Sequence, residues 1–229
     1  MFLESNNKIK WKSLTIAIFT ILLVIITGVL WFDKPMYLFI RQFDCNAWDI
    51  FGRIFSGYVW IAAGAIFLCA FYIKKCIQSK PKFHNESGRI SLLTFINDAL
   101  QKIRTSYVFY IFCACLMSGI VAKILKTLIG RFRPAFFEEL DMVGFNPFST
   151  EWAFNSMPSG HTTVSFAGLF MIGSLVPQKY KWLIYLLAST IAFSRVAAGF
   201  HWPTDVILGA FIGIACANII RATFAKINS

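Results

Sequence analysis

The sequence is poor in charged residues and especially poor in acidic ones. Of its 229 residues only 14% are charged, and 11 Asp and Glu stand against 22 Lys and Arg. Apolar residues make up 57% of the chain, and the mean hydropathy is +0.63. Soluble domains carry roughly 25% charged and about 45–50% apolar residues. This shortage of charge argues against an ordinary soluble domain and indicates a membrane protein.

Cysteines are few and badly placed for a disulfide or a metal site. Four of the six lie inside long apolar stretches, and only Cys45 falls on the side of the membrane that we predict to be oxidising. Cys113 and Cys115 are two residues apart on a predicted helix, so they do not share a face. We therefore expect no internal disulfide and no cysteine metal site. The sequence also shows no convincing carboxylate cluster for Mg²⁺.

Long apolar stretches are what the chain has in abundance. A helix needs roughly 20 mostly apolar residues to cross a hydrocarbon core. Six stretches are candidates, the fourth of them short: Ser13–Phe32, Ile54–Ile73, Tyr107–Leu128, Thr162–Val176, Trp182–Phe200 and Pro203–Ile220. There is no internal repeat and no low-complexity linker. The sequence therefore predicts a single domain over residues 1–229, an all-α integral membrane bundle of six transmembrane helices.

The first apolar stretch follows three lysines within residues 8–12, as the core of a signal peptide does. Its apolar run is longer than an ordinary signal core, however, and it continues into Trp31 and Asp33 without a small-x-small cleavage site. We expect it to be a retained helix.

Basic residues are distributed unevenly among the segments that join the stretches. With the N-terminus inside, the inner segments carry a net charge of +11 and the outer segments carry none. Because Lys and Arg accumulate on the cytoplasmic side of membrane proteins, both termini are expected to be cytoplasmic. We assign the excess positive charge to membrane orientation and anionic headgroups, and not to nucleic acid.

Two connecting segments have sequence patterns that predict contact with the membrane surface. Residues 89–104 carry apolar side chains at helical spacing, which predicts a scaffold helix on the cytoplasmic membrane surface. The outer segment 33–53 is rich in aromatic residues typical of interfacial anchors: Tyr37, Phe39, Phe43, Trp48 and Phe51. In the last stretch, Gly209 and Gly213 form a small-xxx-small pair, which predicts close helix packing.

Three clusters of polar residues lie beside apolar helices on the predicted outer face, where ionisable groups are costly and are therefore functional candidates. The first reads KTLIGRFRP from Lys126 to Pro134. Lys126 and Arg133 are close to two helical turns apart, so they share a face if the helix persists to the residue before Pro134. Two such cations form an anion site. The alternative is that Lys123, Lys126, Arg131 and Arg133 extend to the lipid headgroups.

The second cluster is Pro158–His161, at the entry to the fourth stretch. Ser159 and Gly160 form a turn before a helix, which offers free backbone N–H groups and a hydroxyl to an oxyanion. His161 beside them is suited to proton transfer near neutral pH. The alternative is a helix cap with an interfacial histidine.

The third cluster is Ser194–Asp205, reading SRVAAGFHWPTD, with Pro203 well placed to open the last helix. Asp205, four residues after His201, can accept the Nδ1 proton and leave Nε2 free as a nucleophile. Arg195 adds a cation for phosphate. A capping aspartate and a structural histidine are the alternative, but they leave Arg195 at the edge of an apolar helix unexplained.

Together the clusters resemble the signature of the type 2 phosphatidic acid phosphatase (PAP2) superfamily: K-x6-RP, PSGH and SR-x5-H-x3-D, each complete and in the family order. The resemblance implies a membrane lipid phosphatase in which His201 attacks phosphorus to give a phosphohistidine. Asp205 would orient His201, and His161 would protonate the leaving oxygen and then activate water. The phosphoryl oxygens would be held, without metal or cofactor, by Lys126, Arg133, Ser159, Gly160 and Arg195.

The resemblance leaves the lipid open. Bacterial members act on undecaprenyl pyrophosphate, phosphatidylglycerol phosphate, phosphatidic acid or lipid A phosphates, and we favour undecaprenyl pyrophosphate or lipid A by analogy. The loop Ala135–Met157 is expected to lie over the site and to help select the headgroup. Two other classes are a vanadium haloperoxidase, against which six membrane helices argue, and a transporter, which needs no His-x3-Asp pair beside three phosphate cations.

Overall fold

The computed structural model describes residues 2, 9–78 and 106–227. Within these residues the regular structure is helical, and an isolated bridge joins Arg131 and Phe145. The amphipathic helix expected over residues 89–104 lies outside the described residues.

Each of the six apolar stretches forms a helix close to its predicted bounds. The helices are α1 (Trp11–Thr27), α4 (Gly57–Gln78), α6 (Tyr107–Ile129), α8 (Gly160–Gly173), α9 (Lys181–Ala197) and α10 (Pro203–Ile227). Among the described residues, four helical segments are long and apolar enough to cross a membrane: Trp11–Arg41, Asn46–Lys74, Tyr107–Ile129 and Pro203–Ala225. α8 and α9 have 14 and 17 residues. The chain is therefore an all-α protein with four candidate membrane spans in its described part.

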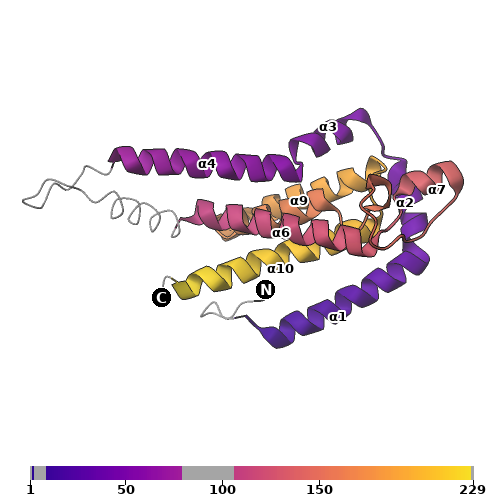
Figure 1. Cartoon of the computed structure of the whole chain (residues 1–229), viewed down its shortest axis with the longest axis horizontal. Helices are drawn as coiled ribbons and strands as arrows, with labels where there is room; N and C mark the ends of the chain where they lie inside the picture. Colours follow the sequence, from indigo (N-terminus) through magenta and orange to yellow (C-terminus); the bar gives the residue numbers. More distant parts are fainter. Residues whose placement is uncertain (1, 3–8, 79–105, 228–229) are drawn as a thin grey trace, which may run out of the picture.

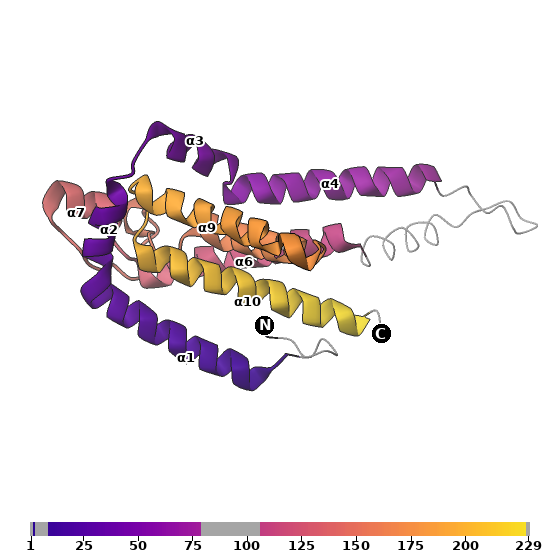
Figure 2. The same cartoon turned by 180° about the vertical axis from the view of Figure 1, so that it is seen from behind.

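The centre of the bundle is α8, which packs against α6, α9 and α10, while α6 also contacts α10. α1 and α4 lie on opposite outer sides of these helices (Figures 1 and 2). One core cluster joins three of the helices through Tyr110, Ala114, Ala167, Met171 and Ala217. Small residues at such contacts let helix backbones approach closely, which is how membrane helices gain packing without a hydrophobic driving force.

The predicted close packing of the last helix is confirmed at both glycines. A methyl group added at Gly209 would lie 2.9 Å from the Ser159 carbonyl oxygen, and one at Gly213 would lie 2.3 Å from the Thr163 carbonyl oxygen. α10 therefore rests directly on the backbone of α8. This contact fixes the start of α10 next to the start of α8.

Short helices gather at one end of the bundle. They are α2 (Asp33–Arg41), α3 (Asn46–Ile54) and α7 (Pro134–Leu140), and α1 continues into α2 through a π-helical turn at Gly28–Phe32 (Figure 1). Phe39 and Phe43 are exposed, as membrane anchors would be, but Tyr37 is fully buried against Trp202. The anchor prediction was wrong for Tyr37 because its hydroxyl donates a hydrogen bond to Glu138 (2.5 Å), which a sequence pattern does not reveal.

The α8–α10 contact predicts a stability effect. Gly213→Ala should lower the free energy of unfolding by about 1–3 kcal/mol, because the new methyl group meets a backbone oxygen that cannot move aside. The matched control is Gly119→Ala in α6, where the nearest side-chain atoms would lie at 3.5 and 3.6 Å. Thermal unfolding in detergent should give a lower Tm for Gly213→Ala only. Equal Tm values for the two variants would contradict the close contact.

Candidate active site

The first cluster lies where α6 ends and the chain reverses. α6 stops at Ile129, and Gly130 follows with φ +63°, a left-handed conformation that glycine adopts without strain. The expectation that the helix persists to Arg133 was therefore wrong, since Arg133 is extended and Pro134 begins α7. Lys126 still points into the site, where its Nζ donates to the carbonyl oxygens of Asn155 (2.5 Å) and Ser156 (3.2 Å).

Arg133 enters the same site from its extended segment. Its guanidinium donates to the carbonyl oxygens of Trp152 (2.9 Å), Phe200 (2.9 Å) and Asn155 (3.2 Å), and it stacks on the Trp152 ring at 4.1 Å. Arg133 is 7% exposed, so the headgroup alternative was wrong for it. Burial lowers the pKa of Arg133 to about 10, which leaves it charged at neutral pH.

The second cluster, Pro158–His161, contacts residues of the first and the third clusters. The Ser159 N–H donates to the carbonyl oxygen of Asp205 (3.0 Å), and Gly160 lies beside the Lys126 side chain. Ser159 is the N-cap residue of α8, as the helix-cap alternative expected, but its side chain makes no capping hydrogen bond to the helix. His161 follows on the first turn of α8, where burial and then the positive charges of Arg195, Lys126 and Arg133 lower its pKa.

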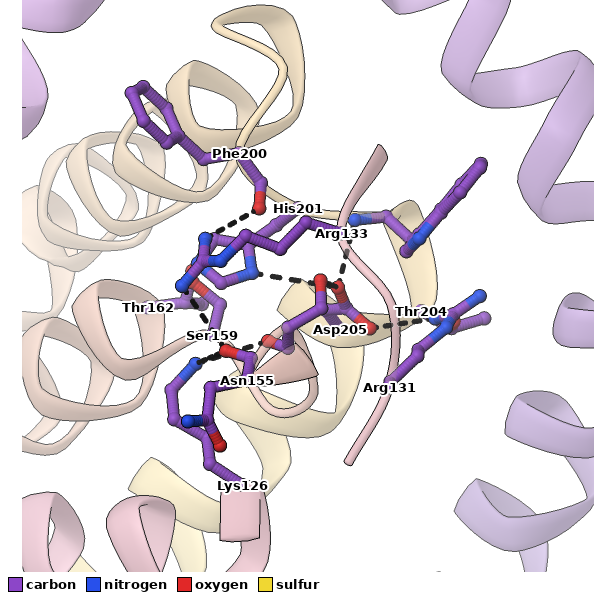
Figure 3. Close-up of polar contacts among 12 residues, drawn as sticks. Lys126, Arg131, Arg133, Asn155, Ser159, Thr162, Phe200, His201, Thr204 and Asp205 are labelled. Atoms are coloured by element: carbon purple, nitrogen blue, oxygen red, sulfur yellow. Dashed lines mark hydrogen bonds and ion pairs between the residues drawn. The ribbon is translucent and has the colours of Figure 1, made fainter. Parts of the chain in front are cut away.

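The third cluster places His201 opposite Asp205 (Figure 3). His201 Nδ1 lies 3.5 Å from Asp205 Oδ2, and both side chains are buried. This distance is longer than a formed hydrogen bond, and Nδ1 has no partner among the described residues. The same Oδ2 accepts the Trp202 N–H (2.9 Å) and the Ser156 hydroxyl. The carboxylate is thus held close to the imidazole without yet bonding it.

The imidazole of His201 is neutral at physiological pH. Burial lowers its pKa well below 6.5, and the positive charges of Lys126 and Arg133 lower it further, while Asp205 acts in the opposite direction. A neutral imidazole has one ring nitrogen with a free lone pair. If Asp205 takes the Nδ1 proton as acceptor, that free nitrogen is Nε2.

Arg195 lies near the end of α9, and one of its buried donors is unused among the described residues. It is 5% exposed, it stacks on the Phe200 ring at 4.3 Å, and its Nε has no hydrogen-bond partner in the described part of the chain. Its guanidinium presses against Gly52 of α3, where an added methyl group would come 1.7 Å from Nη1. Buried donors without partners are rare in proteins. An oxyanion is the kind of group that would satisfy this one.

The balance of charge in the site favours a bound anion. Lys126, Arg133 and Arg195 form no salt bridge among the described residues, although Asp49 is near enough to attract Arg195, whereas Arg131 is paired with Asp33 and Asp205. A tetrahedral oxyanion with two negative charges suits three fixed cations and backbone N–H groups. Across residues 2, 9–78 and 106–227, no group of three or more His, Cys, Asp and Glu is arranged to hold a metal ion.

Sequence reasoning missed several residues that support the site. Arg131 is buried between Asp33 and Asp205, although the sequence offered only a headgroup contact for it. Ser156 bonds Asp205, and Gly52 makes room for Arg195. The one available signal was Asp33, a carboxylate directly after a long apolar stretch, because ionisable residues in such places are functional candidates.

An apolar helical bundle defines a membrane protein, and its buried histidine–aspartate pair lies beside three cations whose arrangement suits an oxyanion. The profile of the PAP2 superfamily matches residues 106–229, which is more than half of the chain. The chain belongs to the PAP2 superfamily.

Individual relatives agree with this placement. A lipid A 1-phosphatase from Rhizobium etli is 34% identical over 60% of this chain and 59% of the relative. The bacitracin transport permease protein BcrC from Bacillus licheniformis is 33% identical over 53% of this chain and 57% of the relative. The crystal structure of Aquifex aeolicus LpxE has the same fold, with a TM-score of 0.52, 23% identity and coverage of 82% of this chain and 93% of that one. The chain thus spans less than two thirds of the curated relatives it matches.

The Arg195 contact predicts a defect in anion binding. Gly52→Ala should displace the guanidinium and weaken binding of orthovanadate about 10-fold, the loss expected for one hydrogen bond to a charged group. Gly57→Ala, where the nearest side-chain atom would lie at 3.4 Å, is the control. Binding can be followed by the rise in Tm with orthovanadate. Unchanged affinity in Gly52→Ala would show that Arg195 does not need this position.

Proposed function

We propose that this protein is a membrane lipid phosphatase that hydrolyses a phosphate or pyrophosphate monoester through a phosphohistidine. The observation that carries the proposal is the buried, neutral His201 next to Asp205, facing three cations that form no salt bridge in the described part of the chain. These groups come from the end of α6, the start of α7, the end of α9 and the start of α10, which gather at one end of the apolar bundle (Figure 1). The single domain assigned to residues 1–229 is part of the same proposal.

The reaction takes two steps. In the first, Nε2 of His201 forms a bond to phosphorus while the bond from phosphorus to the lipid oxygen breaks. His161, kept protonated by the negative charge of the bound phosphate, gives that oxygen a proton. In the second, His161 takes a proton from water, the water oxygen bonds to phosphorus, and the phosphorus–nitrogen bond breaks to release orthophosphate. Asp205 accepts a hydrogen bond from the Nδ1–H of His201 and balances the charge that develops on the ring. Closing the 3.5 Å gap between Nδ1 and Oδ2 requires only a small shift.

The remaining site residues stabilise the charge that spreads over the phosphoryl oxygens. Lys126, Arg133 and Arg195 supply fixed positive charge, and Ser159 with the N–H of Gly160 supplies donors at the start of α8. Preorganised groups of this kind act in a site from which water is largely excluded, so they need little rearrangement during the reaction. We expect turnover without a divalent metal.

The relatives guide the choice of lipid. A lipid A 1-phosphatase aligns at 34% identity over 60% of this chain, which favours lipid A among the envelope lipids over undecaprenyl pyrophosphate, phosphatidylglycerol phosphate and phosphatidic acid. The loop 135–157 supports headgroup selection, because Trp152 and Asn155 in this loop contact Arg133. Loops on a rigid scaffold commonly determine specificity.

The same proposal places the protein in a bacterial inner membrane with six crossings, cytoplasmic termini and an outward-facing site. The +11 charge of the predicted inner segments supports this orientation. α8 spans about 21 Å at 1.5 Å per residue, so it crosses only if the loop before it lies within the membrane boundary. A loop there is tolerated where it is buried in protein, and Asn155, Ser156 and Ser159 are buried.

Activity and nucleophile are tested together. Purified protein in detergent with EDTA should release orthophosphate from one or more of lipid A 1-phosphate, undecaprenyl pyrophosphate, phosphatidylglycerol phosphate and phosphatidic acid, ranked by kcat/KM. His201→Ala should lower kcat about 10³-fold or more, because it removes the attacking nitrogen. His84→Ala changes the one histidine outside the site clusters and should keep full turnover.

Retained turnover in His201→Ala would remove this residue as the nucleophile. A wild-type protein that releases no phosphate from any of the four lipids would instead remove the phosphatase proposal and favour a transporter. Halide oxidation after loading with vanadate would identify a haloperoxidase.

Orientation is tested with cysteine labelling. Cys45 is exposed at the end of the bundle that carries the site, so a membrane-impermeant maleimide should label it in spheroplasts of a strain whose protein keeps no other cysteine. Lys179 lies between α8 and α9, at the opposite end from the start of α8. Lys179→Cys, made in a cysteine-free background, should be labelled only after the membrane is opened. The reverse pattern would place the site in the cytoplasm.

A further inference from the structure

A second buried group of charges lies directly behind Asp205, on the side away from His201 (Figure 3). Its centre is Arg131, which donates through Nη1 to Asp205 Oδ1 (2.7 Å) and through Nη2 to Asp33 Oδ2 (2.6 Å). Asp33 is 2% exposed, and Arg131 is 5% exposed. One guanidinium therefore joins two buried carboxylates from distant parts of the chain.

Thr204 completes this group at the start of α10. Its hydroxyl accepts from Arg131 Nη1 (2.7 Å) and donates to Asp33 Oδ2 (2.5 Å), and its backbone N–H donates to Asp33 Oδ1 (3.0 Å). Asp33 thus satisfies a free N–H of the first turn of α10, as a capping residue does, but from another helix. The residue after Thr204 is Asp205. The capped turn therefore fixes the backbone that carries the catalytic carboxylate.

Asp33 comes from a part of the chain outside the residues that match the PAP2 profile. It is the first residue of α2, which continues α1. The approach is close, since a methyl group added at Gly28 would lie 2.3 Å from the Thr204 side chain. The first membrane helix therefore docks on the start of α10 next to the site.

The two oxygens of Asp205 have separate partners. Oδ1 bonds Arg131, while Oδ2 bonds the Trp202 N–H and faces His201. Arg131, on the side away from His201, therefore sets the orientation of the Asp205 carboxylate. Without Asp33, Arg131 would lose one of the two carboxylates that hold its planar fork in place, and a loosened fork would let Oδ2 turn away from the imidazole.

We propose that Asp33, acting through Arg131, is a positioning residue that fixes Asp205 for its contact with His201. This inference rests on the proposed phosphatase function. It assigns the first membrane helix a part in turnover and not only in anchorage. It also separates the arginine roles, because Arg131 holds the carboxylate, whereas Arg133 and Arg195 hold the phosphoryl group.

The test is Asp33→Asn, which keeps the size of the side chain and its acceptor for the Thr204 N–H. With dioctanoyl phosphatidic acid, or the best of the four lipids, kcat should fall about 10-fold to 100-fold, the range for a residue that orients a reacting group through another. KM and the inhibition constant of orthovanadate should stay within about 2-fold, because the phosphate cations are untouched. Asp44→Asn, which removes an acid that pairs with Arg41 nearby, is the control and should keep the wild-type kcat.

Arg131→Lys is a second variant, which tests whether a loss of kcat arises from a folding defect. A lysine keeps the charge that both carboxylates need, so the bundle should fold, but its single nitrogen cannot reproduce the two-nitrogen fork. It should show the same loss in kcat with unchanged orthovanadate inhibition. Asp33→Glu, which restores the charge, should recover part of the lost kcat.

A double-mutant cycle separates positioning from general stability. If Asp33 acts through Asp205, Asp33→Asn should cause little further loss of kcat in an Asp205→Asn background. The inference is overturned if Asp33→Asn keeps the wild-type kcat, if it weakens orthovanadate inhibition as much as it lowers kcat, or if its effect in the Asp205→Asn background is undiminished. A wild-type protein without phosphatase activity would overturn the proposed function, which is a separate outcome.

Discussion

The geometry of the site depends on one buried guanidinium, that of Arg131. It is held between Asp33 at the end of the first membrane helix and Asp205 at the start of the last one. A charge so deeply buried is tolerable only when it is paired and hydrogen-bonded, and removing one partner costs more than the pair contributes. The three side chains therefore constrain one another. The bond to Arg131 therefore also fixes the orientation of the Asp205 carboxylate that faces His201.

The other cations of the site are arranged in the opposite way. Arg133 and Lys126 are held by backbone carbonyl oxygens, and Arg195 is held by an aromatic ring and the surface of Gly52. Neutral partners fix their positions without cancelling their charge. The protein thus keeps the positive charge of these residues available for a ligand, while Arg131, which two carboxylates bind, is used as a support. The sequence does not reveal that Arg131 pairs with carboxylates and Arg133 with carbonyl oxygens, because the two arginines are only two residues apart.

Local sequence patterns predicted the helices and the signature residues, because apolar runs and motif spacings are local properties. They failed where a tertiary contact decides the outcome. Lys126 and Arg133 do meet, but through a left-handed turn at Gly130 and not along a continuous helix. Tyr37 belongs to an aromatic-rich segment that is typical of a membrane anchor, yet it is buried against Trp202, and its hydroxyl donates a hydrogen bond to Glu138. The partners of Arg131 lie 98 and 74 residues away along the chain, beyond the reach of any periodicity.

The first helix shows why a polar contact is needed at this place. None of the described side chains of α1 is buried in the bundle, and in a membrane apolar surfaces gain little by leaving lipid for another helix. Apolar packing of α1 therefore cannot fix its position. The buried residues of this segment are Gly28, Asp33 and Tyr37, all at the end near the site. Because an unpaired carboxylate there would be costly, Asp33 locates the helix only when Arg131 and Thr204 are in place. Docking of the first helix and orientation of Asp205 thus depend on the same contacts of Asp33 with Arg131 and Thr204.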